Sequence, residues 1–388
     1  METLILGWYV LVETGSALML TVFGALLYPG TLIAPMFGVV GDRIGHRNLL
    51  CAMRAVYTIL AATLMTLAFA GLLTPTLVLI ISALMGIVRP SDLAIRGALV
   101  AQTMPADQLM AAIGISRTTS DSARIVGALG GAGLFAALGM GPAYAVVAAF
   151  YFFGLLLTLG VGGSRSMLRV AAAAPGSLRP PSLWRELWEG IVYVWTTPHL
   201  LAAMWLACLI NLTAFPLSIG LLPYVAKEIY RTDQTGLGYL VASFATGALL
   251  ASMALSWPGR RIRPARMMII FAAVWYGLLL VFAQVRSETG GIVILMLAGF
   301  VQSLSMVPMS VMILSTSSQN FHGRVMGVRM LAIYSLPFGL LTAGVLIDRI
   351  GFPATATLYS VIGLLFTIFI AVRWRADVWR LQAPANIR

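Results

Sequence analysis

The chain has 388 residues, of which 60% are hydrophobic and 10% are charged. Soluble domains are about 45–50% apolar and about 25% charged, because charged side chains cover a surface that faces water. The composition therefore excludes an ordinary soluble enzyme, a disordered chain and a nucleic-acid-binding domain. The net charge of +12 does not reverse this conclusion, because the basic residues stand in short clusters between long apolar runs. The solvent of this chain is mostly the lipid bilayer.

Long apolar segments follow one another along the chain, and each has about the 20 residues that a helix needs to span a bilayer. Eleven such spans are predicted, at residues 18–40, 49–71, 76–97, 109–138, 142–162, 199–223, 235–257, 266–285, 290–315, 326–349 and 354–373. A twelfth segment, residues 3–13, is apolar but reaches only about 16 Å as a helix, roughly half of a bilayer core.

The start of the chain is short in comparison with the corresponding part of the second half. From Leu200 to Gly259 there are 59 positions, whereas from Met1 to Gly41 there are 40. We expect the cytoplasmic half of the first helix to be absent from this sequence.

Arginine alternates from one connection to the next. The connections at 41–54, 164–185, 258–266, 322–329 and 373–388 are rich in arginine, and those between them contain few basic residues. Because cytoplasmic connections carry the excess of positive charge, the arginine-rich set is predicted to be cytoplasmic. This orientation predicts a multi-pass protein of the cell's cytoplasmic (inner) membrane, with both ends inside once a complete first helix is assumed.

The two halves of the chain resemble each other across a polar linker. The glycine-rich stretch 127–131 precedes Gly141-Pro142, and a similar stretch at 339–344 precedes Gly351-Phe352-Pro353, about 212 positions later. We therefore predict an all-α integral membrane protein with two six-helix bundles related by pseudo-two-fold symmetry, an arrangement typical of transporters. The predicted domains are a bundle at 1–163 with an incomplete first helix, a linker at 164–198, a bundle at 199–375 and a cytoplasmic tail at 376–388.

Within the linker, residues 182–195 form a candidate amphipathic helix at the cytoplasmic surface. Its apolar residues are Trp184, Leu187, Ile191 and Val194. The same segment also serves as a connector between the two bundles.

The loop after the second predicted helix reads Gly38-Val-Val-Gly41-Asp42-Arg43-Ile-Gly45-His46-Arg47. It is similar to the G-x-x-x-D-R-x-G-[RK]-[RK] loop of the major facilitator superfamily, with His46 in place of the first basic residue. The resemblance implies the 12-helix fold of that family, here with a truncated first helix. It also implies that Asp42 belongs to a charge network that holds one conformation and breaks in the other. The alternative is a polar loop that only anchors helix ends.

A second, similar stretch runs from Gly344 through Asp348-Arg349 to Gly351. It lies at the predicted outer end of the eleventh helix, and no basic pair follows it. We interpret it as a helix terminus.

Four further segments resemble the enterobactin-exporter-like branch of the same superfamily: Trp8 to Ser16, Arg89 to Asp92, Asp121 to Gly131 and Phe321 to Val328. The stretch at 127–131 is also similar to the antiporter motif G-P-x-x-G-G, with Ala128 in place of proline. The resemblance implies proton-coupled export of drugs or siderophores.

Charged side chains inside predicted spans are candidates for function, because a charge in the bilayer is costly. Asp121 and Arg124 lie one turn apart near the middle of the fifth helix, so they form either a proton-coupling pair or a static one. Asp92 and Arg96 are four positions apart and can pair as part of a gate or contact substrate. The whole predicted charge network contains Asp121, Arg124, Glu13, Arg89, Asp92 and Arg96.

Glu13, near the outer end of the first helix, either binds substrate or protons or faces water. Neutral polar residues at Asn211, Gln302 and Ser303 either line a cavity or tie helices together. No histidine–cysteine cluster, nucleophile–base pair or phosphate loop is visible, so no metal, no cofactor and no enzyme activity is expected.

These patterns together predict a monomeric secondary active transporter that exports small amphipathic compounds by alternating access. Its partners are the small-molecule substrate, protons and the lipid bilayer, and nucleic acid is not among them. One alternative is a metabolite uptake carrier of the same fold. Another is a transporter-like membrane sensor that does not transport.

Overall fold

The computed structural model describes residues 1–30, 44–103, 109–160, 183–255, 263–318 and 321–376. Within these ranges it leaves out the side chains of residues 46, 90–103, 109–118, 121, 183, 184, 186, 187, 322 and 323. The elements in the described parts of the chain are all helices, which confirms the predicted all-α class.

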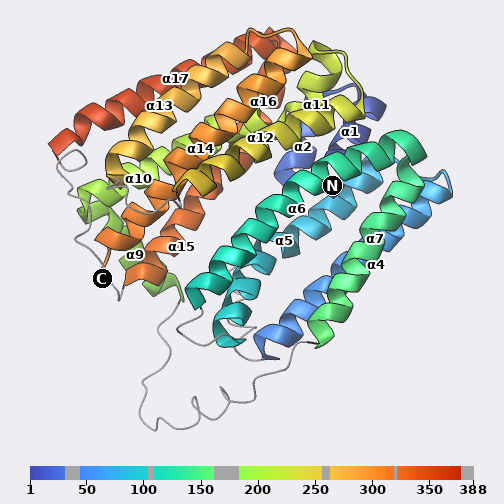
Figure 1. Ribbon diagram of the computed structural model, residues 1–388, viewed down its shortest axis with the longest axis horizontal. Coiled ribbons are helices and arrows are strands. Elements are labelled where there is room, and N and C mark those ends of the chain that lie inside the picture. The colour runs from blue at the N-terminus through green and yellow to red at the C-terminus, as the bar shows by residue number, and fades with distance from the viewer. Residues whose placement is uncertain (31–43, 104–108, 161–182, 256–262, 319–320, 377–388) are drawn as a thin grey trace.

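The first half contains the helices up to residue 160, and Figure 1 shows most of them as one group. They are α1 (Glu2–Thr14), α2 (Ala17–Leu26), α4 (His46–Phe69), α5 (Pro75–Thr103), α6 (Leu109–Leu138) and α7 (Met140–Gly160). The helix α1 has only 13 residues and ends at Gly15, whose φ of 63° is left-handed and therefore suits glycine. The hydroxyl of Ser16 then accepts the backbone N–H of Met19 and starts α2, so a tight turn joins the two helices.

The second half follows the linker helix α9 (Leu183–Thr196). Its helices are α10 (Pro198–Leu209), η1 (Ile210–Ala214), η2 (Pro216–Gly220), α11 (Leu222–Tyr224), η3 (Val225–Ile229), α12 (Gln234–Leu255), α13 (Pro264–Phe282), α14 (Glu288–Thr316), α15 (His322–Ile333), α16 (Ser335–Ile350) and α17 (Phe352–Arg373). Because α10 to η3 and α15 to α16 each continue along one path, they count as single spans.

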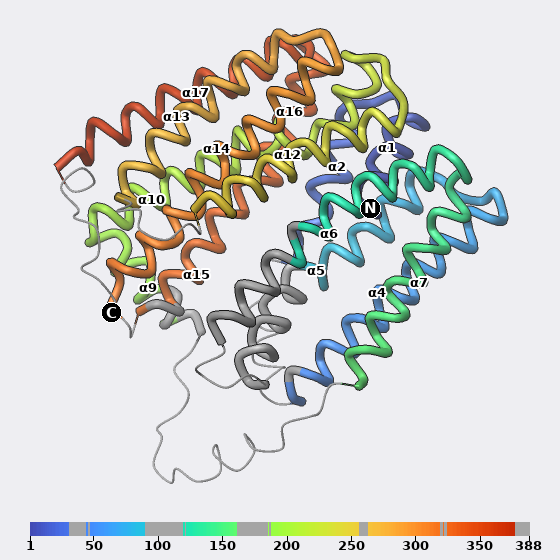
Figure 2. Tube along the Cα trace, in the orientation of Figure 1, coloured from blue at the N-terminus to red at the C-terminus, as the bar shows by residue number. Residues whose placement is uncertain are grey.

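Among the described residues, 8 helices are long and apolar enough to cross a membrane. Three shorter apolar helices, Ala17–Leu26, Pro75–Arg89 and Ser122–Leu138, fall within three further predicted spans. Each of the eleven predicted spans therefore contains at least part of a helix among the described residues, and residues 31–40 of the span 18–40 lie outside them. The blue end of the chain, α1 and α2, lies between the two groups of helices (Figure 2).

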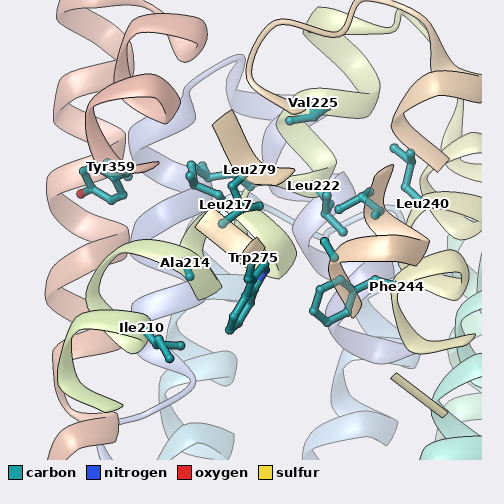
Figure 3. Packing of buried hydrophobic residues seen from close by; sticks show 14 of the residues in the cluster. Ile210, Ala214, Leu217, Leu222, Val225, Leu240, Phe244, Trp275, Leu279 and Tyr359 are labelled. Atoms are coloured by element: carbon teal, nitrogen blue, oxygen red, sulfur yellow. The ribbon is translucent and has the colours of Figure 1, made fainter. Parts of the chain in front are cut away.

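The best-packed part of the core lies in the second half. Residues of α10 to η3, α12, α13 and α17 gather there around Trp275 (Figure 3). Trp275 and its neighbour Tyr276 are both fully buried. The seventh span winds through three π-helical turns near Pro216 and Pro223. Proline removes a backbone donor, and the wider turns keep other donors paired, as when the Leu221 N–H reaches the carbonyl of Pro216.

Candidate functional site

A cavity of about 140 Å³ lies inside the first half of the molecule. Its lining comes from α1, α2, α4, α5 and α7, and consists of Glu2, Thr3, Leu6, Phe23, Leu27, Arg54, Tyr57, Ser82, Met85, Arg89 and Tyr151. A more open pocket of about 240 Å³ shares Glu2, Thr3, Arg89 and Tyr151 with it. The cavity thus has an apolar wall of leucine, phenylalanine and methionine, and a polar wall of charges and hydroxyls.

The polar wall stands at mid-depth in the membrane. Glu2 is about 18 Å along α1 from Thr14, and Tyr151 is about 17 Å along α7 from Met140, both measured from the predicted outer side. A bilayer core is about 30 Å thick, so both groups lie close to its middle. Charged groups at this depth are costly, so Glu2 is a candidate for a function.

The centre of the polar wall is a hydrogen bond between Tyr151 and Glu2. The tyrosine hydroxyl donates to Oε2 of Glu2 over 2.6 Å, and the ring of Tyr151 stacks on Tyr57 with centroids 5.3 Å apart. The other carboxylate oxygen of Glu2 is buried and has no hydrogen-bond partner among the described atoms. One oxygen of the carboxylate is therefore hydrogen-bonded to Tyr151, and the other is open to a further hydrogen bond.

Arg89 completes this wall from α5. It lines both pockets and lies within electrostatic reach of Glu2 and Tyr151. The side chains of Arg89 and Glu2 are both described, and they form no direct ion pair. Opposite charges that share a cavity without touching can each take part in binding a third group.

Glu2 and Tyr151 were not among the residues predicted from the sequence, whereas Arg89 was. Glu2 was missed because it stands in the first turn of α1, beside a segment judged too short to span. The signal that could have found it is the acidic residue itself, which stands directly before the apolar segment 3–13.

Of the other members of the predicted charge network, Glu13 and Arg124 do not line this cavity. Glu13 is exposed near the end of α1, and Arg124 is exposed on α6. The side chains of Asp92, Arg96 and Asp121 lie outside the described residues, although the helices α5 and α6 that carry them are described.

The loop motif is described only in part, because Gly38, Gly41, Asp42 and Arg43 lie outside the described residues, as does the side chain of His46. Gly45 has a φ of 89° and stands just before α4, which is the role expected of a turn glycine. The guanidinium of Arg47 donates to the carbonyl of Leu159 near the end of α7. This bond ties the motif to the sixth span.

The predicted polar residues of the second half are bonded within their own helices. The amide of Asn211 donates to the carbonyl of Ala207 over 2.9 Å, and the hydroxyl of Ser303 donates to Gln302 over 3.4 Å. Asn211 and Ser303 are buried, and Gln302 is half-buried. No hydrogen bond among the described residues joins Asn211 to Gln302 or Ser303.

The two halves touch closely at one membrane side, and we call these contacts the outer seal: Gly238 of α12 on Ala132 of α6, and Gly344 of α16 on Thr21 of α2. A β-carbon added at Gly238 would lie 2.4 Å from the β-carbon of Ala132, and one added at Gly344 would lie 2.1 Å from the Thr21 hydroxyl. All four residues lie within about two turns of helix ends on the side opposite the arginine-rich connections. The halves therefore pack closely on the predicted outer side in this conformation.

Comparison with known proteins supports the same architecture. Residues 3–337 match the family model described as Major Facilitator Superfamily. No curated protein matches the chain in sequence. Among solved structures, the chain is similar to the inward-open conformation of the xylose transporter XylE from E. coli, with a TM-score of 0.68 and 13% sequence identity, covering 99% of this chain and 95% of that one. At this identity the likeness concerns the fold.

Proposed function

The chain belongs to the Major Facilitator Superfamily, a family of transporters, and we propose that it exports small amphipathic compounds of the drug or siderophore class in exchange for protons. We also propose that it belongs to the enterobactin-exporter-like branch of the superfamily and lies in the cell's inner membrane. The observation that carries the proposal is the cavity between α1, α2, α4, α5 and α7, with Glu2 and Arg89 on one wall.

The lining of the cavity suits an amphipathic compound. Leu6, Phe23 and Met85 offer an apolar surface, while Arg89 and Tyr151 offer charge and a hydroxyl. Small-molecule sites in proteins combine such apolar walls with a few polar groups that fix orientation. A compound with one polar end and one apolar end can satisfy both walls at once.

Glu2 is the group that we assign to proton exchange. Its carboxylate accepts the hydroxyl of Tyr151 and faces Arg89, Arg54 and Tyr57 across the cavity. Protonation removes its negative charge and changes how the cavity holds a charged ligand. Asp121, about 26 Å along α6 from Leu138, is the second carboxylate to test.

The outer seal accounts for the direction of access. With Gly238 packed on Ala132 and Gly344 packed on Thr21, the cavity is reached from the cytoplasm. An exporter loads its substrate in this state. Opening of the seal and closure at the cytoplasmic side then release the substrate outside.

The loop motif is assigned to the closure at the cytoplasmic side, through Asp42. Asp42→Asn should sharply reduce transport without lowering the amount of protein in the membrane. Asp348→Asn, in the similar stretch at the outer end of α16, is the matched control and should do less. Equal losses in both variants would contradict the assignment of the gate to the first copy.

The function is tested by accumulation in cells with and without the gene, using ethidium, a catecholate siderophore and xylose as probes. Export predicts that cells with the gene retain less of the dye or the siderophore, and that a proton uncoupler abolishes the difference. Higher retention of xylose, with no change for the other two probes, would contradict export and establish an uptake carrier of the same fold. No effect on transport of any amphipathic probe would contradict the substrate class.

A further inference from the structure

The linker helix α9 is clamped to the second half along one face. The carboxylate of Glu189 forms an ion pair with Arg324 of α15 over 3.0 Å, and Gly190 lies against the backbone of the same arginine. The ring of Tyr193 stacks on Phe321 with centroids 4.4 Å apart, and its hydroxyl accepts the backbone N–H of Ser318. Because ion pair, ring stacking and backbone contact act together, the rotation of α9 about its own axis is fixed.

This fixed orientation leaves an apolar stripe uncovered. The stripe consists of Trp188, Val192 and Trp195, whose exposed fractions are 66%, 44% and 64%. Their spacing of four and then three positions places them on one side of a helix. Gly190 and Val194, which pack inward, lie on the other side, so α9 has a buried face and a separate apolar face.

The position of α9 in the chain brings this stripe to the membrane boundary. Thr196 ends α9 and Pro198 begins α10, so a single residue separates α9 from a helix that is long and apolar enough to cross the bilayer. The exposed Trp205 of α10 continues the apolar surface into the membrane. Arg185, one turn before the stripe, pairs with Glu189 over 3.1 Å, and its side chain is 76% exposed.

We propose that α9 lies in the cytoplasmic leaflet, with Trp188, Val192 and Trp195 inserted among the lipids at the level of the headgroups. Tryptophan favours this level, because its ring is apolar and its N–H can reach water or a headgroup. The helix thus joins the leaflet on one face to the start of α15 on the other. Because α9 packs on α15, lipid contact at α9 holds the first end of the eleventh span in place. The other end of that span is in α16, which belongs to the outer seal.

The proposal is tested with the full chain in vesicles of phosphatidylethanolamine and phosphatidylglycerol, in a background where Cys51 and Cys208 are replaced by alanine. A nitroxide on Val192→Cys should collide more often with oxygen, which dissolves in lipid, than with a water-soluble nickel complex. Two references frame the result: Phe366→Cys on the exposed face of α17 for lipid, and Arg286→Cys in an exposed loop for water. Nickel access at residue 192 equal to that at residue 286 would overturn the proposal.

The tryptophans are tested in the same labelled protein. Replacing Trp188 and Trp195 by serine should remove the protection of residue 192 from nickel, whereas replacing both by phenylalanine should keep it. Protection that persists in the serine variant would contradict a role for the indoles. Protection in native membranes but not in pure lipid vesicles would show that another protein covers the stripe, and would also overturn the proposal.

Discussion

The two halves of this protein differ in the polar groups that they bury. In the first half, Glu2, Arg54 and Arg89 meet at one cavity at mid-depth in the membrane. In the second half, the buried polar groups are neutral pairs, such as the hydroxyls of Thr213 and Tyr276 at 2.8 Å. Among the acidic side chains that the structure describes, Glu2 is the one at mid-depth. The charged groups at the cavity therefore belong to the first half, whereas the second half packs around neutral polar groups.

Burial follows the same division. In the seventh span, Pro198–Ile229, 72% of the most apolar window is buried, against 28% in Met140–Gly160, the sixth span of the first half. Charges need room for ligand and water, whereas neutral pairs can be enclosed, because a satisfied hydroxyl costs little to bury. The difference indicates that substitutions in the first half change transport and that those in the second half change stability.

The largest effect is expected at Glu2. Glu2→Gln keeps the shape of the side chain and its bond to Tyr151 but removes the charge that can be gained and lost. In proteoliposomes, transport driven by a pH gradient should be lost while exchange of substrate across the membrane remains. Tyr151→Phe is the matched control, since it removes only the hydrogen bond and should retain gradient-driven transport.

Arg89 should have the next largest effect. A hydrogen bond to a charged group is worth about 1.5–3 kcal/mol, so Arg89→Gln should weaken substrate binding by about tenfold or more. Arg349→Gln, at an exposed position on α16, is the control and should leave binding unchanged. Equal affinity in the Arg89 variant and the unmodified protein, measured by calorimetry, would remove Arg89 from the site.

The outer seal gives a smaller and more selective effect. Gly238→Ala places a methyl group against Ala132, and such overpacking costs about 1–3 kcal/mol. The ratio of outer-closed to outer-open molecules should fall by about tenfold, since 1.4 kcal/mol corresponds to that factor. Distances between spin labels at Leu129 and Tyr239 measure this ratio. Gly277→Ala, where the added group meets open space, should leave the ratio as it is.

The smallest effect on transport is expected in the second half. Thr213→Val leaves the hydroxyl of Tyr276 buried without its partner, so the free energy of unfolding should fall by about 1–3 kcal/mol. Activity per folded molecule should stay the same, and thermal denaturation in detergent measures the change. Replacing Tyr276 by phenylalanine in the same protein should restore most of the stability, because both partners of the bond are then gone. A loss of transport that exceeds the loss of folded protein would contradict the claim that substitutions in the second half change only stability.

The spans could be predicted from the sequence because they depend on apolar length alone. The π-helical turns of the seventh span could not, because they depend on how Pro216 and Pro223 are accommodated among neighbouring helices. Arg89 was predicted because a charge inside an apolar run stands out. Glu2 and Tyr151 were not, since a tyrosine in an apolar helix gives no signal and their meeting joins positions 149 residues apart. The assignments of Asp121, Asp92 and Asp42 remain predictions.

The central claim is that the charge of Glu2 in the first half controls the seal between the halves. It is tested most directly by the distance between spin labels at Leu129 of α6 and Tyr239 of α12, measured as the pH is lowered. In this conformation the carboxylate accepts the hydroxyl of Tyr151 and shares the cavity with Arg89, so loss of its charge in acid should shift the protein toward the outer-open state. The account predicts that this shift is lost in Glu2→Gln. The same pH-dependent shift in Glu2→Gln as in the unmodified protein would contradict it.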